Sequence, residues 1–363
     1  MMPQPRVTFS VITAAYEAAA TIGAAVESVL RQTYPALEMI ISDDGSTDSI
    51  AEALEPFKAD VTVVSNPHRG PGATRNAALR VASGDFVVIL DADDVYEPRR
   101  LEALAGLIQR RPELDIATTD AFLERNGNVV GRFYNESFPF PEEKQRGEIL
   151  RRCFLFAPAV RRERIDAIGG FDESAEVVPA EDWDCWIRLV LDGARAGVVQ
   201  EPLVRYRLHA GSLTANRAQS LRARVAVLEK AAKRSDLTAE ELDGLERSIA
   251  RRRRDAVVAE AAAAAATGAP DVRARSLAML LTHGVGARER LRAAAGVVSP
   301  KIVCPSGTSP VSTRRTSSGS CLSSRGERSS RCTVHIPGLG PKTLSRFNPC
   351  SFIASLKSRS GRS

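Results

Sequence analysis

Three carboxylates stand directly after an apolar run in the first third of the chain. Residues 87–90, Val-Val-Ile-Leu, have the length of a buried strand, and Asp91, Asp93 and Asp94 follow them. Side chains alternate across a strand, so Asp91 and Asp93 share one face while Asp94 points away. Acids this close repel one another, and Mg2+ or Mn2+ prefers carboxylate and phosphate oxygens. A solvated acidic turn after a strand is common, so this short pattern alone favours such a turn and leaves a metal site as the alternative.

A second acidic pair, Asp43 and Asp44, follows another expected strand at residues 39–41. Strands and amphipathic helices alternate in this part of the chain, which predicts a doubly wound α/β fold with a parallel sheet. In such sheets ligands bind at the carboxyl ends of the strands, so we expect both acidic clusters to face one pocket. The expected elements cover, in chain order, residues 7–12, 18–31, 39–41, 49–57, 61–65, 73–81 and 86–90.

The basic character of the chain is concentrated in its last 63 residues. Residues 301–363 hold 11 Lys and Arg against one acid, whereas the first 300 hold 39 basic and 43 acidic residues, a balance of −4. Sixteen of the last 63 residues are serine and apolar periodicity is missing, so we expect a disordered tail. Two readings stay open for it: a tail that contacts nucleic acid or a membrane surface, or an extension without function.

Three parts are expected along the chain: an α/β domain at residues 1–215, a helical region at 216–299 and the tail at 300–363. Only Cys153 and Cys185 precede the tail, which indicates a reduced, cytoplasmic setting rather than a disulfide framework. No run reaches the roughly 18 apolar residues that span a bilayer. We therefore expect a cytoplasmic protein, with peripheral contact at the inner face of the plasma membrane as a further possibility.

Several short motifs occur in a characteristic order between residues 9 and 209. Together they closely resemble the family 2 glycosyltransferases with the GT-A fold, and the resemblance covers roughly residues 7–215. It implies a nucleotide-diphospho-sugar transferase-like fold with a mostly parallel sheet flanked by helices. It also implies transfer of a sugar from a nucleotide-sugar donor, UDP- or GDP-linked, to an acceptor hydroxyl with inversion. The motifs are residues 9–12, 28–35, 41–48, 72–76, 90–94, 169–172, 181–184 and 206–209.

The resemblance assigns roles to the acidic cluster that follows residue 90. Asp93 would be the direct ligand of Mn2+ or Mg2+, and Asp91 would reach the donor ribose or the metal. Such an ion stabilises the charge on a departing nucleoside diphosphate. Asp94 would be structural or face the acceptor, and His209 would contact the donor or the metal, with a purely structural histidine as the alternative.

Other donor-binding positions follow from the same resemblance. Asp44 would accept a hydrogen bond from the nucleobase, and Asp43 would serve the same pocket or form an Asx turn. Ala14 would contact base and ribose through its backbone, and Tyr16 would stack or pack there. Ala14 and Glu17 depart from the usual family pattern, so we assign no side-chain role to Glu17.

The general base implied by the resemblance is Asp182, in a Glu-Asp pair that opens a helix. A base must begin unprotonated, and the helix macrodipole favours an ionised carboxylate at this end. The alternative is that Glu181 and Asp182 only cap the helix. Arg75 would touch the donor phosphates or pair with a core acid such as Asp91.

Two other classes of protein are weighed against this interpretation. A nucleotidyltransferase normally has a Gly-rich, Lys- or Arg-bearing signature after the first strand, and residues 13–20 hold neither Lys nor Arg. A non-catalytic binding protein with an RNA-interacting tail would not need the acidic residues together, and we expect no nucleic-acid partner. The acceptor, in polysaccharide biosynthesis, would be a saccharide or a lipid-linked saccharide. The helices after Asn216 would form an acceptor or membrane platform through residues 251–254, or simply carry a solvated charge run there.

Overall fold

The computed structural model describes residues 6–209, 211–212 and 216–298, so the expected tail lies outside the described residues. Within the described part, nine strands form a single sheet. The strands are β1 (Phe9–Ala15), β2 (Glu38–Asp43), β3 (Thr62–Ser65), β4 (Phe86–Ile89), β5 (Val95–Tyr96), β6 (Ile116–Arg125), β7 (Asn128–Arg132), β8 (Ala159–Arg161) and β9 (Ala196–Arg207).

The sheet has a parallel half and a mixed half. Strands β3, β2, β1 and β4 lie side by side and run parallel, as the alternating pattern predicts. Then β8 enters antiparallel between β4 and β6, β9 runs parallel to β6, and β5 and β7 pair antiparallel at the far side. The α/β fold class is therefore confirmed, but parallel pairing does not extend through the whole sheet.

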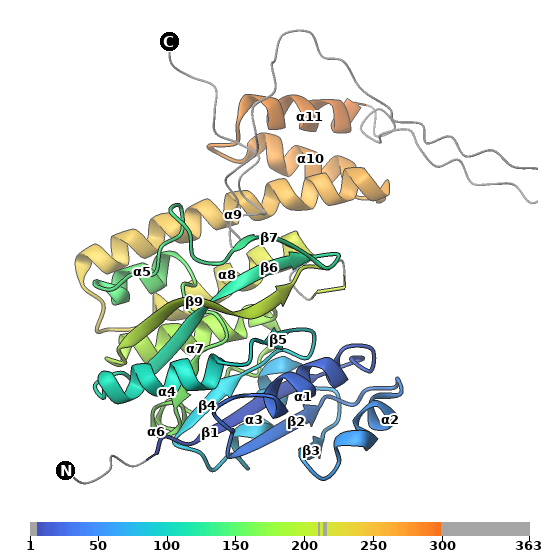
Figure 1. Cartoon of the computed structure of the whole chain (residues 1–363). Helices are drawn as coiled ribbons and strands as arrows, with labels where there is room; N and C mark the ends of the chain where they lie inside the picture. Colours follow the sequence, from blue (N-terminus) through green and yellow to red (C-terminus); the bar gives the residue numbers. More distant parts are fainter. Residues whose placement is uncertain (1–5, 210, 213–215, 299–363) are drawn as a thin grey trace, which may run out of the picture.

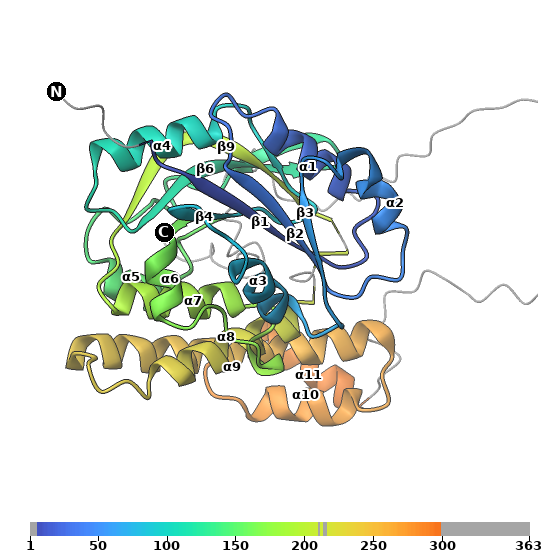
Figure 2. The same ribbon diagram turned by 90° about the horizontal axis from the view of Figure 1, so that it is seen from below.

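Helices cover both faces of the sheet. Figure 2 shows α1, α2 and α4 on one face and α3, α6 and α7 on the other. Strands β1 and β4 are nearly all buried between these layers, which explains why they read as continuous apolar runs. The helices are α1 (Ile22–Leu30), α2 (Ile50–Leu54), α3 (Pro71–Leu79), α4 (Arg100–Arg110), α5 (Gln145–Arg151), α6 (Arg162–Ala167), α7 (Glu181–Leu191), α8 (Arg217–Ala231), α9 (Ala239–Thr267), α10 (Val272–Leu281) and α11 (Ala287–Val298), with 3-10 turns at Glu55–Phe57 and Ala175–Val177.

The last four helices form layers outside α7 (Figure 1). Helix α9 begins with a capping box in which Thr238 and Glu241 each accept from the other's backbone N–H. Helix α8 and the first part of α9 share the main apolar core, through residues such as Leu228 and Leu245. Helices α10 and α11 pack instead on a small separate cluster that includes Ala261 and Met279. The expected domain boundary near residue 215 stays a prediction.

Residues 251–254 do not form one solvated basic face. Arg252 is buried, donates to the carbonyl of Arg151 at 2.6 Å and lies with its guanidinium 5.0 Å from the centre of the Trp183 ring. Arg253 pairs with Glu229 at 2.6 Å. Arg252 therefore fixes α9 to α5 and α7, a role that the sequence pattern did not reveal. Among the described helices, none combines the length and apolar character required for a membrane span.

Candidate active site

The two acidic clusters lie at the same edge of the parallel half, where β1, β2 and β4 end. Ala14 and Ala15 of β1 are in register with Ser42 and Asp43 of β2. On the other side of β1, Ile12 is in register with Ile89, so the acidic turn after β4 emerges beside the end of β1. The backbone N–H of Asp44 donates to the carbonyl of Ala15 at 2.8 Å, which ties the β2 loop to this edge. The predicted convergence of the clusters on one edge is confirmed.

A buried arginine connects the edge to helix α7. Arg75, in α3, donates to Oδ1 of Asp91 at 3.0 Å and to Oε1 of Glu181 at 2.5 Å. Burial lowers the pKa of Arg75, but the carboxylates of Glu181, Asp91 and Asp182 outweigh that effect and raise it. The second oxygen of Glu181, Oε2, is buried without a hydrogen-bond partner among the described residues. Of the two roles considered for Arg75, the structure has the pairing with Asp91.

Asp182 lies next to this bridge in the first turn of α7. Its Oδ1 accepts from the backbone N–H of Trp183, while the N-cap position belongs to Ala180, whose side chain makes no cap. The pKa of Asp182 is raised to about 6, first by burial and then by the neighbouring carboxylate of Glu181, with Arg75 acting in the opposite direction. Desolvation and the like charge of Glu181 thus outweigh any lowering of this pKa by the helix macrodipole, and the role of Asp182 as base stays a prediction. Neither acid caps the helix by the usual side-chain bond.

Asp93 and Asp94 are adjacent in sequence but have different partners. Oδ2 of Asp93 lies 2.8 Å from Nε2 of His209, at the end of β9. Burial raises the pKa of Asp93, Asp91 raises it too, and His209 lowers it. Asp94 is buried and accepts from the backbone N–H of Arg207 at 2.9 Å, so it joins the β4 turn to β9. Burial, followed by the charges of Asp91 and Asp93, raises its pKa well above the usual range.

The residues after β4 provide some, but not all, of the ligands that a divalent cation requires. Asp91 keeps one carboxylate oxygen outside its bond to Arg75, and its side chain is 44% exposed. Asp93 and His209 add an oxygen and a nitrogen nearby. In the described part of the chain, no group of three or more Asp, Glu, His or Cys side chains is gathered tightly enough for a complete metal site. Asp93 and Asp91 could therefore hold a divalent ion only together with oxygens from a bound diphosphate or water.

The β2 acids take part mainly in loop structure. Asp44 is buried, and its two oxygens accept from the backbone N–H groups of Arg69 at 2.9 Å and Gly70 at 3.0 Å. His68 Nδ1 also lies 3.0 Å from its Oδ2. Asp43 accepts from the backbone N–H and the hydroxyl of Ser46, which is the Asx turn considered as the alternative for Asp43. The role of Asp44 toward a nucleobase stays a prediction.

Tyr16 and Glu17 connect the first loop to the β2 loop. The ring centres of Tyr16 and His68 are 4.3 Å apart with a 32° tilt, and Tyr16 is 49% exposed. Glu17 has a positive φ of 51° and accepts from the backbone N–H of Thr47 at 2.7 Å and from its hydroxyl at 2.9 Å. Sequence reasoning missed this role of Glu17, because the partner lies 30 residues away on another loop.

With this geometry in hand, comparisons with known proteins decide the family. The family model described as glycosyl transferase family 2 matches residues 10–168. This stretch of the chain is therefore a family 2 glycosyltransferase domain. The UDP-Glc:alpha-D-GlcNAc-diphosphoundecaprenol beta-1,3-glucosyltransferase WfaP of Escherichia coli is 29% identical over 214 residues, 58% of this chain and 82% of that protein. Chondroitin synthase of Escherichia coli is 32% identical over 186 residues, 50% of this chain and 26% of that protein.

Solved structures agree with the fold. TarS of S. aureus in complex with UDP-GlcNAc has a TM-score of 0.56 at 17% identity, covering 80% of this chain and 91% of that one. The mannosyltransferase PcManGT of Pyrobaculum calidifontis, in complex with GDP-Man and Mn2+, has a TM-score of 0.52 at 21% identity, covering 82% and 87%. The GT-A fold is thus confirmed, and the protein is a glycosyltransferase. Neither the nucleotidyltransferase nor the non-catalytic alternative is favoured.

Asn76 has a structural role at this site that the sequence did not reveal. Asn76 accepts from the backbone N–H of Phe171 at 2.8 Å and donates to its carbonyl at 2.9 Å, which fixes the loop before α7 against α3. A Cβ atom on Gly170 would lie 2.4 Å from Oδ1 of Asn76, and one on Gly72 would lie 2.2 Å from the carbonyl oxygen of Asp172. These two glycines therefore allow the close contact that holds Arg75 and Asp182 on the same edge. Their presence in two of the matched motifs was the available signal.

Proposed function

We propose that the protein transfers a hexose from a nucleotide-diphosphate sugar to an acceptor hydroxyl, with inversion at the anomeric carbon. The observation that carries this proposal is the bridge from Asp91 through Arg75 to Glu181, beside Asp182. It brings an acid at the expected donor side and the expected base to one edge of the sheet. Family membership and the GT-A fold support the same reaction class.

Asp182 is the general base in this proposal. A direct displacement requires a carboxylate within hydrogen-bond reach of the acceptor hydroxyl, opposite the leaving group. With a pKa of about 6, Asp182 is mostly ionised at neutral pH and is more basic than an ordinary aspartate. The positive charge of Arg75 balances the negative charges of Glu181 and Asp91. Asp182 therefore does not lie beside two uncompensated carboxylates.

The donor diphosphate would lie over the turn after β4. Asp93 and Asp91 are the proposed ligands of Mn2+ or Mg2+, and His209 orients Asp93 through the 2.8 Å contact. When bound, the ion supplies Lewis-acid stabilisation of the departing diphosphate. A structural neighbour is described in complex with GDP-Man and Mn2+, which supports a cation at this step.

The nucleoside would lie at the ends of β1 and β2. Ala14, Tyr16, Asp43 and Asp44 border this part of the edge, and the exposed Tyr16 ring offers a stacking surface. Neighbours in complex with UDP, UDP-GlcNAc and GDP-Man support a UDP- or GDP-linked donor. The name of one relative includes a diphosphoundecaprenol acceptor, which supports a lipid-linked saccharide as acceptor and a role in polysaccharide biosynthesis.

A donor screen tests the proposal. Purified protein is incubated with UDP-Glc, UDP-GlcNAc or GDP-Man, with Mn2+ or with EDTA, and release of free nucleoside diphosphate is measured. We expect one donor to be hydrolysed slowly in a cation-dependent way, and Asp93→Ala and Asp182→Asn to abolish this release. The matched control Asp243→Asn removes an exposed carboxylate on α9 and should leave the rate unchanged. Full activity of Asp93→Ala, or no hydrolysis of any donor, would overturn the proposal.

A further inference from the structure

Three large apolar side chains are exposed on the outermost helices. Leu277 and Leu281 lie one turn apart on α10 and are 49% and 73% exposed, and Leu291 on α11 is 72% exposed. The opposite faces of these helices are used for packing, through Met279 and Ala293. Figure 1 shows α10 and α11 on the side of α9 that faces away from the sheet. The leucines therefore do not belong to the core.

Arginines accompany these leucines. Residues 272–298 contain five arginines and one glutamate. Arg275 pairs with Asp271, and Arg290 donates to the carbonyls of Val285 and Thr282. The other three are exposed and form no ion pair with the described residues. They are Arg273, Arg288 and Arg292.

The leucines and the exposed arginines share helix faces. Arg273 lies one turn before Leu277 on α10. On α11, Arg288 lies one turn before both Leu291, at i+3, and Arg292, at i+4. Each helix thus presents an exposed strip that combines leucine with unpaired cation. We call these two strips together the Leu/Arg face.

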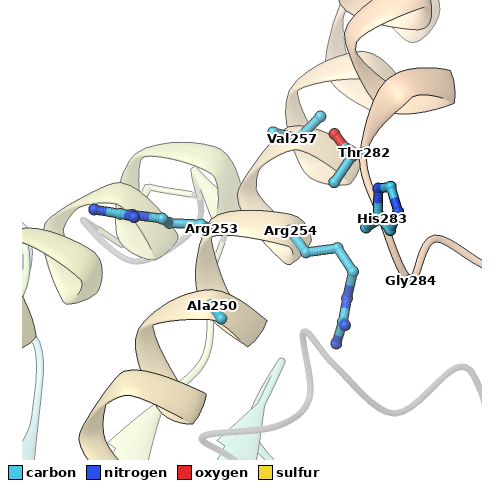
Figure 3. A pocket seen from close by; sticks show the side chains of 7 residues that line it. All are labelled: Ala250, Arg253, Arg254, Val257, Thr282, His283 and Gly284. Atoms are coloured by element: carbon cyan, nitrogen blue, oxygen red, sulfur yellow. The ribbon is translucent and has the colours of Figure 1, made fainter.

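A hollow of about 540 Å³ near the Leu/Arg face is lined in part by two further arginines, Arg253 and Arg254. It lies where α9 meets the turn between α10 and α11, and Figure 3 shows the side chains that line it. In that view Arg253 and Arg254 extend in different directions, and Arg253 pairs with Glu229. Arg254 lies beside the turn at His283 and Gly284, two to three residues after Leu281. The hollow is remote from the carboxylates of the candidate active site.

We propose that the Leu/Arg face docks on the surface of a bilayer that contains anionic phospholipid. Exposed leucines gain free energy by leaving water for the acyl boundary, and unpaired arginines are attracted by lipid phosphates. Burial of the leucines and attraction of the arginines require the same orientation of the protein on the bilayer. The shared helix faces allow this. Arg254, whose Nε lies 3.9 Å from Oδ1 of Asp255, borders the face at the hollow and is not required for docking.

Charge and apolar surface together select this occupant. A second copy of the same face would bring Arg273, Arg288 and Arg292 against like charges, which disfavours self-association. A nucleic acid would use the arginines but would leave the leucines in water. The proposal concerns a surface outside the active site, so it goes beyond sugar transfer and can fail without affecting it.

Vesicle cosedimentation of the full-length chain tests the proposal. The vesicles contain either phosphatidylcholine alone or equal parts of phosphatidylcholine and phosphatidylglycerol. We expect binding to the mixed vesicles, weakened about 100-fold by Arg273→Gln, Arg288→Gln and Arg292→Gln together. Leu277→Ser, Leu281→Ser and Leu291→Ser together should weaken it about tenfold or more.

Two control triples keep charge and composition matched. One replaces Arg31, Arg222 and Arg247, exposed arginines in ion pairs elsewhere, by Gln. The other replaces Leu30, Leu37 and Leu242, exposed leucines elsewhere, by Ser. Both should bind like the wild type, and residues 301–363 are the same in every protein, so their basic charge cancels. Absent or charge-independent binding by the wild type, wild-type binding by either test triple, or equal loss in the controls would overturn the proposal. Release of nucleoside diphosphate is measured in parallel and tests the proposed function separately.

Discussion

The Asp91 side and the Asp44 side of the candidate site use acidic residues in opposite ways. Around Asp91, the buried guanidinium of Arg75 pairs with two carboxylates, those of Asp91 and Glu181, and the neighbouring Asp182 has a raised pKa. Around Asp44, both carboxylate oxygens are taken by the backbone N–H groups of the loop that starts α3. An acid that is paired with another side chain can still take part in chemistry. An acid whose two oxygens both accept from backbone N–H groups serves mainly to fix the loop. The sequence pattern alone does not distinguish these two cases.

The largest expected effect comes from removing the shared cation. Arg75→Met leaves Glu181 and Asp91 without their counter-charge, and breaking a buried ion pair on one side costs about 3–5 kcal/mol. Urea unfolding should show this loss in the free energy of unfolding. Arg222→Met, which breaks an exposed pair with Glu260, should cost less than about 1 kcal/mol. Equal effects would mean that the Arg75 bridge is not buried as described.

Asp44→Ala tests the saturated side. The substitution leaves the N–H groups of Arg69 and Gly70 without their acceptor, which we expect to cost about 2 kcal/mol in urea unfolding. Asp44→Asn keeps one acceptor oxygen and should cost less. If Asp44 also contacts the nucleobase, the KM for the hydrolysed donor should rise in both variants. A wild-type unfolding curve for Asp44→Ala would contradict the structural role of this acid.

His209→Ala has a smaller expected effect, confined to the cation. Loss of the 2.8 Å contact frees Asp93 from its orienting partner, and such partners typically change metal affinity by about tenfold or more. The measurement is the Mn2+ concentration that gives half-maximal donor hydrolysis. His283→Ala, at the distant hollow, is the matched control. If His209→Ala requires the same Mn2+ concentration as the wild type, His209 has no role in metal binding.

The smallest expected effect is a gain in stability. The pKa of Asp182 is about 6 when folded and about 3.9 when unfolded, so ionisation above pH 6 disfavours the folded state. Wild-type stability should therefore fall as the pH rises from about 4 to 6. Asp182→Asn lacks this charge and should therefore be more stable than the wild type at pH 8, measured by urea unfolding. Lower stability of the variant at pH 8 would contradict the raised pKa.

The fold was largely predictable because its parallel half consists of apolar strands buried on both faces. Runs such as residues 9–12 and 86–89 are typical of strands buried on both faces of an α/β sheet, and the carboxyl ends of parallel strands share an edge. The mixed half was harder, because β5 has two residues and β8 three. The antiparallel strands β6 and β7 are joined at Asn126 and Gly127, residue types that are typical of a hairpin turn.

Within the site, composition predicted the residue types but not their partners. Arg75 and Glu181 are 106 residues apart, and no local pattern links them. The direction of the Asp182 pKa shift was also out of reach, because it depends on burial and on which neighbour Arg75 neutralises.

The most direct test of the account is the pH dependence of kcat/KM for the donor that the screen identifies. The wild type should lose activity tenfold per pH unit below about pH 6, because Asp182 must be ionised to act as base. Asp182→Asn should retain donor binding and lose at least about 100-fold in kcat at every pH, with no limb near pH 6. Wild-type rates in Asp182→Asn, or the same acidic limb in both proteins, would contradict the assignment of Asp182 as the base.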